Sequence, residues 1–107
     1  MKCNDRVFLS PRERATVLAI LEPLRAQFGA VKVFGSRATG CARPASDLDL
    51  VVFPPASRSE LRDLKFAFEE SDLPITVDVL AWDVIDHQPL RDEISRHAVP
   101  LFDEAAA

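Results

Sequence analysis

The residues best suited to chemistry are two aspartates at alternate positions, Asp47 and Asp49. The apolar run from Leu48 to Phe53 predicts a strand that the acids open. Residues two apart in a strand point to the same face and lie roughly 6.5–7 Å apart. Both carboxylates can therefore lean toward one cation, and we interpret the pair as a candidate metal site.

A small turn precedes the acid pair. Gly35 and Ser36 follow the apolar residues Val33 and Phe34, and ten residues separate Ser36 from Asp47. Glycine-containing turns leave backbone N–H groups that can face a phosphate, and glycine permits close backbone approach. This spacing predicts a site for a metal-bound nucleoside triphosphate.

A third acid, Asp78, stands between Val77 and Val79 in the strand-like run 74–80. A carboxylate there is costly to bury unless a cation or hydrogen bonds compensate. Each acid taken alone could be a solvated or edge residue. The three acids together with the Gly-Ser turn favour a metal site.

Other interpretations of the same residues fit less well. In phosphatase-type sites the acids follow a buried strand, and the first acid becomes a covalent phosphoryl carrier. In this chain the acids instead stand at the beginning of a predicted strand. A calcium loop needs further oxygen ligands and a central glycine, and the apolar residues around Asp49 exclude one here. A Walker loop ends in Gly-Lys-Ser/Thr, and this ending is absent after Gly35. Arg91 and His97 have an R-x5-H spacing found in ribonucleases, but a basic helix end that complements the helix dipole explains His97 better.

The surrounding pattern predicts a small α/β domain. Ser10 to Glu13 form a capping box before a helix that Pro23 should kink or split and that Gly29 should cap. Ser57 or Ser59 should cap a second helix. We expect helices at 11–28, 60–70 and 90–97, a short turn-helix after Gly35, and strands at 30–34, 48–53, 75–80 and 99–102. This order predicts a mixed three- to four-stranded sheet with helices mainly on one face.

Composition limits the function classes. The chain has 107 residues, 48% of them hydrophobic, which predicts a single domain over residues 1–107. We expect a cytoplasmic protein, since neither a membrane-length apolar run nor a signal peptide is visible. A net charge of −4 without a basic stripe argues against a nucleic-acid template. Cys3 and Cys41 form no C-x-x-C motif and are expected to be free thiols.

The segment from Phe34 to Gly40, followed by Ser46 to Leu50, resembles the nucleotidyltransferase superfamily that includes DNA polymerase β. It looks most like the minimal nucleotidyltransferases of bacteria and archaea, and the element order matches over nearly the whole chain. One departure is visible, since many relatives have Arg where this chain has Thr39.

The resemblance implies attack of a hydroxyl on the α-phosphorus of a nucleoside triphosphate, with AMP transferred from ATP. It implies two Mg²⁺ ions, with Mn²⁺ as an alternative, shared by Asp47 and Asp49, while Asp78 holds the ion on the acceptor side. Gly35 and Ser36 would contact the β- and γ-phosphates, and Arg37 would neutralise leaving-group charge.

The resemblance also implies a partner. Such proteins are commonly encoded beside a HEPN-domain ribonuclease toxin, which the nucleotidyltransferase neutralises as an antitoxin, so a hetero-oligomer or homo-oligomer is expected. Two alternatives stay open: a non-catalytic module that neutralises the partner by masking it, and a transferase for a small molecule. The missing substrate domain disfavours the small-molecule transferase.

Overall fold

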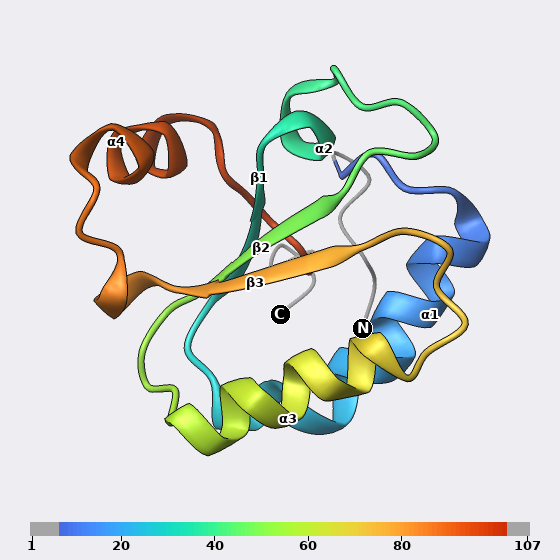
Figure 1. Ribbon diagram of the computed structural model, residues 1–107, viewed down its shortest axis with the longest axis horizontal. Helices are drawn as coiled ribbons and strands as arrows, with labels where there is room; N and C mark the ends of the chain where they lie inside the picture. Colours follow the sequence, from blue (N-terminus) through green and yellow to red (C-terminus); the bar gives the residue numbers. More distant parts are fainter. Residues whose placement is uncertain (1–6, 103–107) are drawn as a thin grey trace.

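The computed structural model describes residues 7–102, and a four-stranded mixed sheet lies at its centre (Figure 1). The strand order is β3-β2-β1-β4, and the strands are β1 (Val31–Phe34), β2 (Leu48–Val52), β3 (Val77–Ala81) and β4 (Val99–Pro100). Strand β1 pairs antiparallel with β2 and β4. Strands β2 and β3 are parallel, so helix α3 (Arg58–Glu69) connects them as a crossover. The mixed sheet predicted from the sequence is confirmed.

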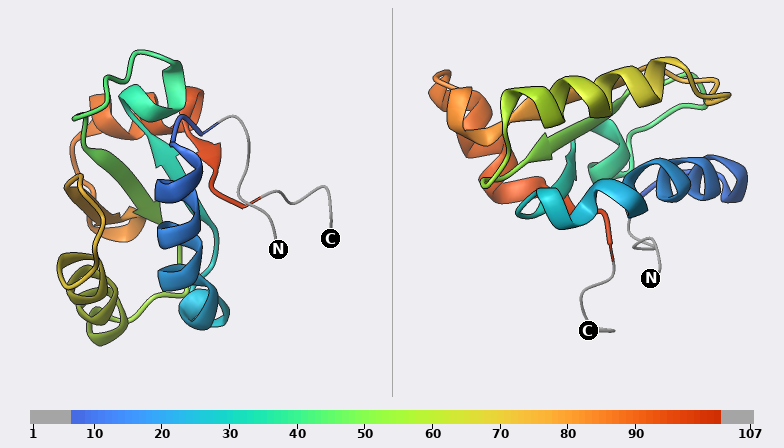
Figure 2. Two further views of the ribbon diagram at one scale, coloured as in Figure 1. Left: turned by 90° about the vertical axis from the view of Figure 1, so that its right-hand side faces the viewer. Right: turned by 90° about the horizontal axis from the view of Figure 1, so that it is seen from below.

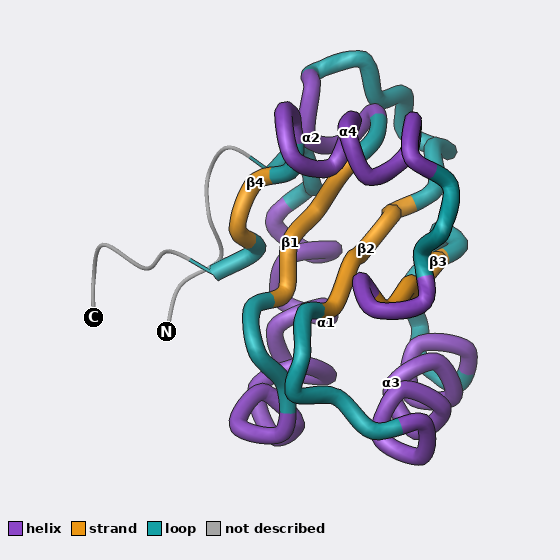
Figure 3. The backbone as a smooth tube through the Cα atoms, turned by 90° about the vertical axis from the view of Figure 1, so that its left-hand side faces the viewer, coloured by secondary structure: helices purple, strands orange, loops and turns teal. Residues whose placement is uncertain are grey.

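Alternating side chains give the sheet two apolar faces. One face packs against α1 (Pro11–Leu21) and α3, through residues that include Val17, Val33, Leu50 and Leu64. Helix α4 (Gln88–His97) packs on the opposite face through Ile94. Figures 2 and 3 show this arrangement, with α4 on one side of the sheet and α1 on the other. The expectation that helices lie mainly on one face holds for α1 and α3, whereas α4 is the exception.

Local sequence signals explain the helix starts. The Ser10 hydroxyl accepts the Glu13 N–H, and the Glu13 carboxylate accepts the Ser10 N–H in return. Ser57 and Glu60 form the same capping box ahead of α3, so Ser57 rather than Ser59 is the cap. Pro23 splits the first helical segment as predicted. Helix α1 ends at Leu21, and the 3₁₀ segment η1 (Glu22–Gln27) follows.

The prediction that Gly29 caps this helix is wrong. Its N–H donates to the carbonyls of Phe53 and Pro55, at 3.0 and 3.1 Å, so it tethers the start of β1 to the end of β2. A Cβ at this position would lie 2.1 Å from the Pro54 carbonyl oxygen. Glycine is required here because two backbone segments approach closely.

The remaining short elements are α2 (Ser36–Thr39) and the 3₁₀ segment η2 (Trp82–Val84). Among residues 7–102, no helix has the length and apolar character needed to cross a membrane.

Candidate active site

Two of the predicted acids are direct partners in the sheet. Asp49 on β2 pairs in parallel register with Asp78 on β3, and Phe34 at the end of β1 is the antiparallel partner of Asp49. Neighbouring strands lie about 4.8 Å apart, so the carboxyl groups of a register pair on one face can interact. Asp47 is exposed and precedes β2 by one residue. The structure therefore brings the three acids to one end of the strand pair.

The electrostatics of Asp49 show how closely the acids are gathered. Burial, the negative charges of Asp78 and Asp47, and a hydrogen bond with Asp78 together raise the pKa of its carboxyl from 3.8 to about 6. Asp49 is half-buried, while Asp47 and Asp78 are exposed. A cation that neutralised the neighbouring negative charges would favour the ionised form of Asp49.

The donor set fits a hard divalent cation, because carboxylate oxygens are the ligands that Mg²⁺ prefers. Within the described part of the chain, no group of three or more His, Cys, Asp or Glu side chains is arranged to hold a metal ion. Asp47, Asp49 and Asp78 are therefore candidate ligands on the strength of their carboxylate chemistry and strand register alone.

Gly35 sets the distance between the acids and the Gly-Ser turn. Its φ of 73° and ψ of −154° are rarely adopted by other residues. A Cβ at Gly35 would lie 2.6 Å from an Asp49 carboxylate oxygen. The absence of a side chain therefore lets the Asp49 carboxylate lean over the turn, where Ser36 begins α2.

A hollow of about 430 Å³ adjoins the acids. Asp49 and Asp78 line it together with Lys65 and Glu69, which lie one turn apart on α3. Sequence reasoning missed both α3 residues. Their i, i+4 spacing is visible in the sequence, but their position beside Asp78 depends on how the crossover lays α3 against β3.

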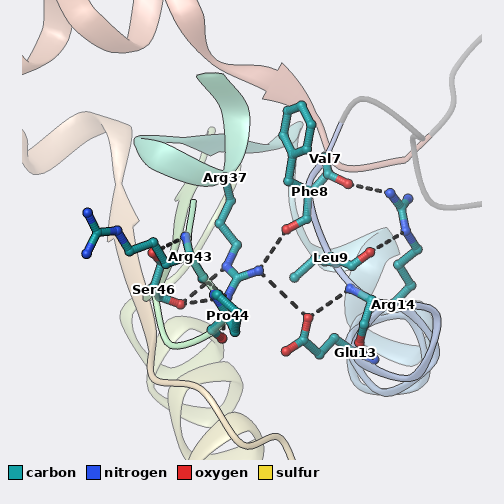
Figure 4. Close-up of polar contacts among 10 residues, drawn as sticks. Val7, Phe8, Leu9, Glu13, Arg14, Arg37, Arg43, Pro44 and Ser46 are labelled. Atoms are coloured by element: carbon teal, nitrogen blue, oxygen red, sulfur yellow. Dashed lines mark hydrogen bonds and ion pairs between the residues drawn. The ribbon is translucent and has the colours of Figure 1, made fainter. Parts of the chain in front are cut away.

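Arg37 does not face this hollow as expected. Its side chain is 4% exposed, and its guanidinium lies 3.7 Å from the Glu13 carboxylate (Figure 4). The guanidinium donates to the carbonyls of Phe8 and Ser46, both at 2.8 Å, and of Pro44 at 3.2 Å. The side chain is thus committed to main-chain acceptors rather than turned toward a phosphate.

These bonds give Arg37 a positioning role. Ser46 immediately precedes Asp47, and its hydroxyl also accepts the Arg43 N–H at 2.8 Å, which closes the loop between α2 and β2. The planar guanidinium joins this loop to the segment before α1, as Figure 4 shows. Arg37 therefore fixes the approach of the chain to Asp47.

The other singled-out residues lie apart from the acids. Arg91 stacks on the Trp82 ring at 3.9 Å and donates to the Trp82 and Ile85 carbonyls, so packing explains it. His97 is exposed at the end of α4. Cys41 is a free, exposed thiol, whereas Cys3 lies outside the described residues.

The raised pKa of Asp49 predicts a specific pH dependence of stability without metal. Because the folded-state pKa of about 6 exceeds the unfolded value of 3.8, the protonated carboxyl stabilises the fold. This contribution is complete below about pH 4 and is lost as the pH rises through about 6. We expect Asp49→Asn to melt at a higher temperature than the wild type at pH 7.5 in EDTA, with the gap closing at pH 4.5.

Thermal melts of both proteins at the two pH values measure this effect. Asp63→Asn, which removes an exposed carboxylate from α3, controls for the change in net charge. An Asp49→Asn protein that is less stable than the wild type at pH 7.5 would contradict the assigned electrostatics.

Comparisons with known proteins agree with this geometry. The family model "Polymerase beta, Nucleotidyltransferase" matches residues 20–106. A protein of Haemophilus influenzae described as a probable protein adenylyltransferase, MntA, is 45% identical over 76 residues. That match covers 69% of this chain and 66% of the relative, so the chain spans just under two thirds of the relative's length.

Solved structures share the fold. A protein assigned as a minimal nucleotidyltransferase is 35% identical, with a TM-score of 0.61 over 84% of this chain and 90% of that one. The MNT antitoxin of Shewanella oneidensis, solved in complex with a tri-AMPylated HEPN toxin, has a TM-score of 0.60 at 14% identity, over 89% of this chain and 73% of that one. From the family match and the arrangement of its acids, this chain belongs to the polymerase β nucleotidyltransferase family.

Proposed function

We propose that this protein transfers AMP from ATP to a hydroxyl group on a partner protein, with release of pyrophosphate, and thereby acts as an antitoxin. The observation that carries the proposal is the register pairing of Asp49 with Asp78, with Gly35 against the Asp49 carboxylate. Family membership supports the reaction type. The description of the Haemophilus relative and the AMPylated HEPN toxin of the Shewanella complex support the choice of nucleotide and partner.

The proposed roles follow the position of each residue. Asp47 and Asp49 hold the metal-bound triphosphate, while Gly35 and Ser36 present the turn to its β- and γ-phosphates. Two Mg²⁺ ions, or Mn²⁺, held by the acids would polarise the phosphate and stabilise the attacking and leaving oxygens. Asp78 lies on β3, an edge strand of the sheet, and we assign it to the acceptor side, where it would accept the hydroxyl proton.

Arg37 enters this proposal as a positioning residue, because its donors hold the loop before Asp47. We further propose a single domain that acts in the cytoplasm and completes its acceptor site with the partner protein, a HEPN-domain toxin. Correct placement of the acceptor hydroxyl near the α-phosphorus supplies a large part of the rate in such reactions.

The test uses ATP labelled on its α-phosphate, Mg²⁺ and the protein encoded beside this chain, for which we propose a HEPN domain. We expect label to move onto a hydroxyl side chain of the partner and Asp47→Asn to prevent it. If Asp47→Asn transfers no label yet neutralises the partner as fully as the wild type does, the protein is a masking module and the proposal is wrong.

A further inference from the structure

A second hollow continues from the acids along the outer edge of the sheet. It has a volume of about 450 Å³ and lies between α3 and β3. It shares Lys65, Val79 and Leu80 with the hollow that Asp49 and Asp78 line. The two hollows therefore form one continuous groove, which we call the α3–β3 groove.

The side of the groove formed by the sheet is an unpaired strand edge. Strand β3 stands at the end of the order β3-β2-β1-β4, so in the described part of the chain only β2 pairs with it (Figure 3). An edge strand offers main-chain donors and acceptors to an added strand. Apolar side chains line the groove beside this edge, among them Leu61 and Val84, which is 73% exposed.

The side formed by the helix is cationic. Arg58, Arg62 and Lys65 line the groove, are exposed, and follow one another at spacings of four and three residues on a single face of α3. The sign of charge reverses at Glu69, one turn beyond Lys65 and beside Asp78. This short positive stripe corrects the expectation from the sequence that the chain, whose net charge is −4, has no basic stripe.

We propose that the α3–β3 groove is the acceptor docking surface and that it takes an extended, acidic polypeptide segment added as a strand to β3. Carboxylates of this segment pair with Arg58 and Arg62, and its hydroxyl residue reaches the acids at Asp78. The hydroxyl placement rests on the proposed AMP transfer, whereas the docking does not.

The chemistry of the groove favours a polypeptide over a nucleic acid. Five of the eight residues that line the second hollow are apolar: Leu61, Val79, Leu80, Ala81 and Val84. Nucleic-acid surfaces are instead much more polar and positively charged. Strand β3 has five residues, so at about 3.3 Å per residue an added strand of similar length would run along Val77–Ala81 and pass Asp78.

The binding test uses a fluorescein-labelled nine-residue peptide of alternating Glu and Val with one terminal Tyr. Fluorescence polarisation should show it binding the full chain, with affinity falling as salt rises. A Lys-for-Glu version and a version N-methylated at alternate backbone positions should bind about tenfold more weakly or worse, because they lose charge pairing and strand hydrogen bonds.

The matched variants are Arg58→Glu with Arg62→Glu, and Arg12→Glu with Arg96→Glu as an equal charge change outside the groove. Circular dichroism should show both folded. The groove variant should lose about tenfold or more in peptide affinity, and the control variant should bind as the wild type does. Equal affinity of the groove variant and the control overturns the proposal. The proposal is also overturned if a single-stranded RNA binds the groove and the acidic peptide does not.

The same proteins separate this inference from the proposed function. Label transfer to the HEPN-domain partner that is unaffected by Arg58→Glu with Arg62→Glu overturns the docking surface and leaves the transfer reaction standing. Peptide docking that depends on these arginines, in a protein that transfers no label, supports the docking surface and refutes the reaction.

Discussion

Asp78→Asn is expected to slow AMP transfer by about 100-fold or more while leaving the affinity for Mg–ATP nearly unchanged. Asp78 lies on the edge strand β3, and Asp49, its register partner on β2, lies one strand further into the sheet. In the proposed function, its carboxylate serves the incoming hydroxyl rather than the triphosphate. Single-turnover kinetics with preformed Mg–ATP complex isolate the chemical step from nucleotide binding.

Asp83→Asn is the matched control, because Asp83 is exposed just beyond the end of β3 and lines neither hollow. This variant should transfer AMP at the wild-type rate. An Asp78→Asn protein with a normal single-turnover rate would remove Asp78 from the chemistry.

Arg37→Ala should destabilise the fold by about 3 kcal/mol, since it leaves several main-chain carbonyls and the Glu13 carboxylate without their charged donor. The midpoint of thermal unfolding should fall by more than about 10 °C. The loop before Asp47 should also loosen, so the remaining folded protein should bind Mg–ATP more weakly. Calorimetric melts and nucleotide titrations below the melting range measure the two effects separately.

Arg43→Ala removes an exposed arginine from the same loop and should change the melting temperature little. Arg37→Lys should lower the melting temperature as Arg37→Ala does, because an ammonium group cannot replace a planar guanidinium that donates hydrogen bonds to several carbonyls. A fully stable Arg37→Ala protein with impaired nucleotide binding would instead place Arg37 at the phosphates, as the sequence first indicated.

The strands and the acids could be predicted because they depend on local patterns. Alternating or continuous apolar residues mark β1 and β2 in the sequence. Gly35 marks the turn after β1, because its backbone conformation is one that glycine adopts readily and other residues rarely adopt. The spacing of Asp47 and Asp49 was informative because residues two apart in a strand point to the same face of the sheet. Their pairing across β2 and β3 then follows from the strand register.

The missed features depend on contacts between segments distant in the sequence. Arg37 was expected at the phosphates because the sequence does not show that Phe8, 29 residues away, supplies a carbonyl to its guanidinium. The position of Gly29 after a helical segment suggests a helix cap, but glycine is required there because the Pro54 carbonyl oxygen approaches too closely for a side chain. Lys65 gains its position beside Asp78 from the placement of α3. Neither hydrophobic periodicity nor turn chemistry encodes such approaches.

The most direct test of the candidate site is a calorimetric titration of ATP in the presence and absence of Mg²⁺. Wild-type protein and the Asp63→Asn control should bind ATP in a Mg²⁺-dependent manner. Asp49→Asn should lose that binding while its melting curve shows an intact fold. Equal Mg²⁺-dependent affinity in Asp49→Asn and the wild type would contradict the assignment of these acids as the metal–nucleotide site.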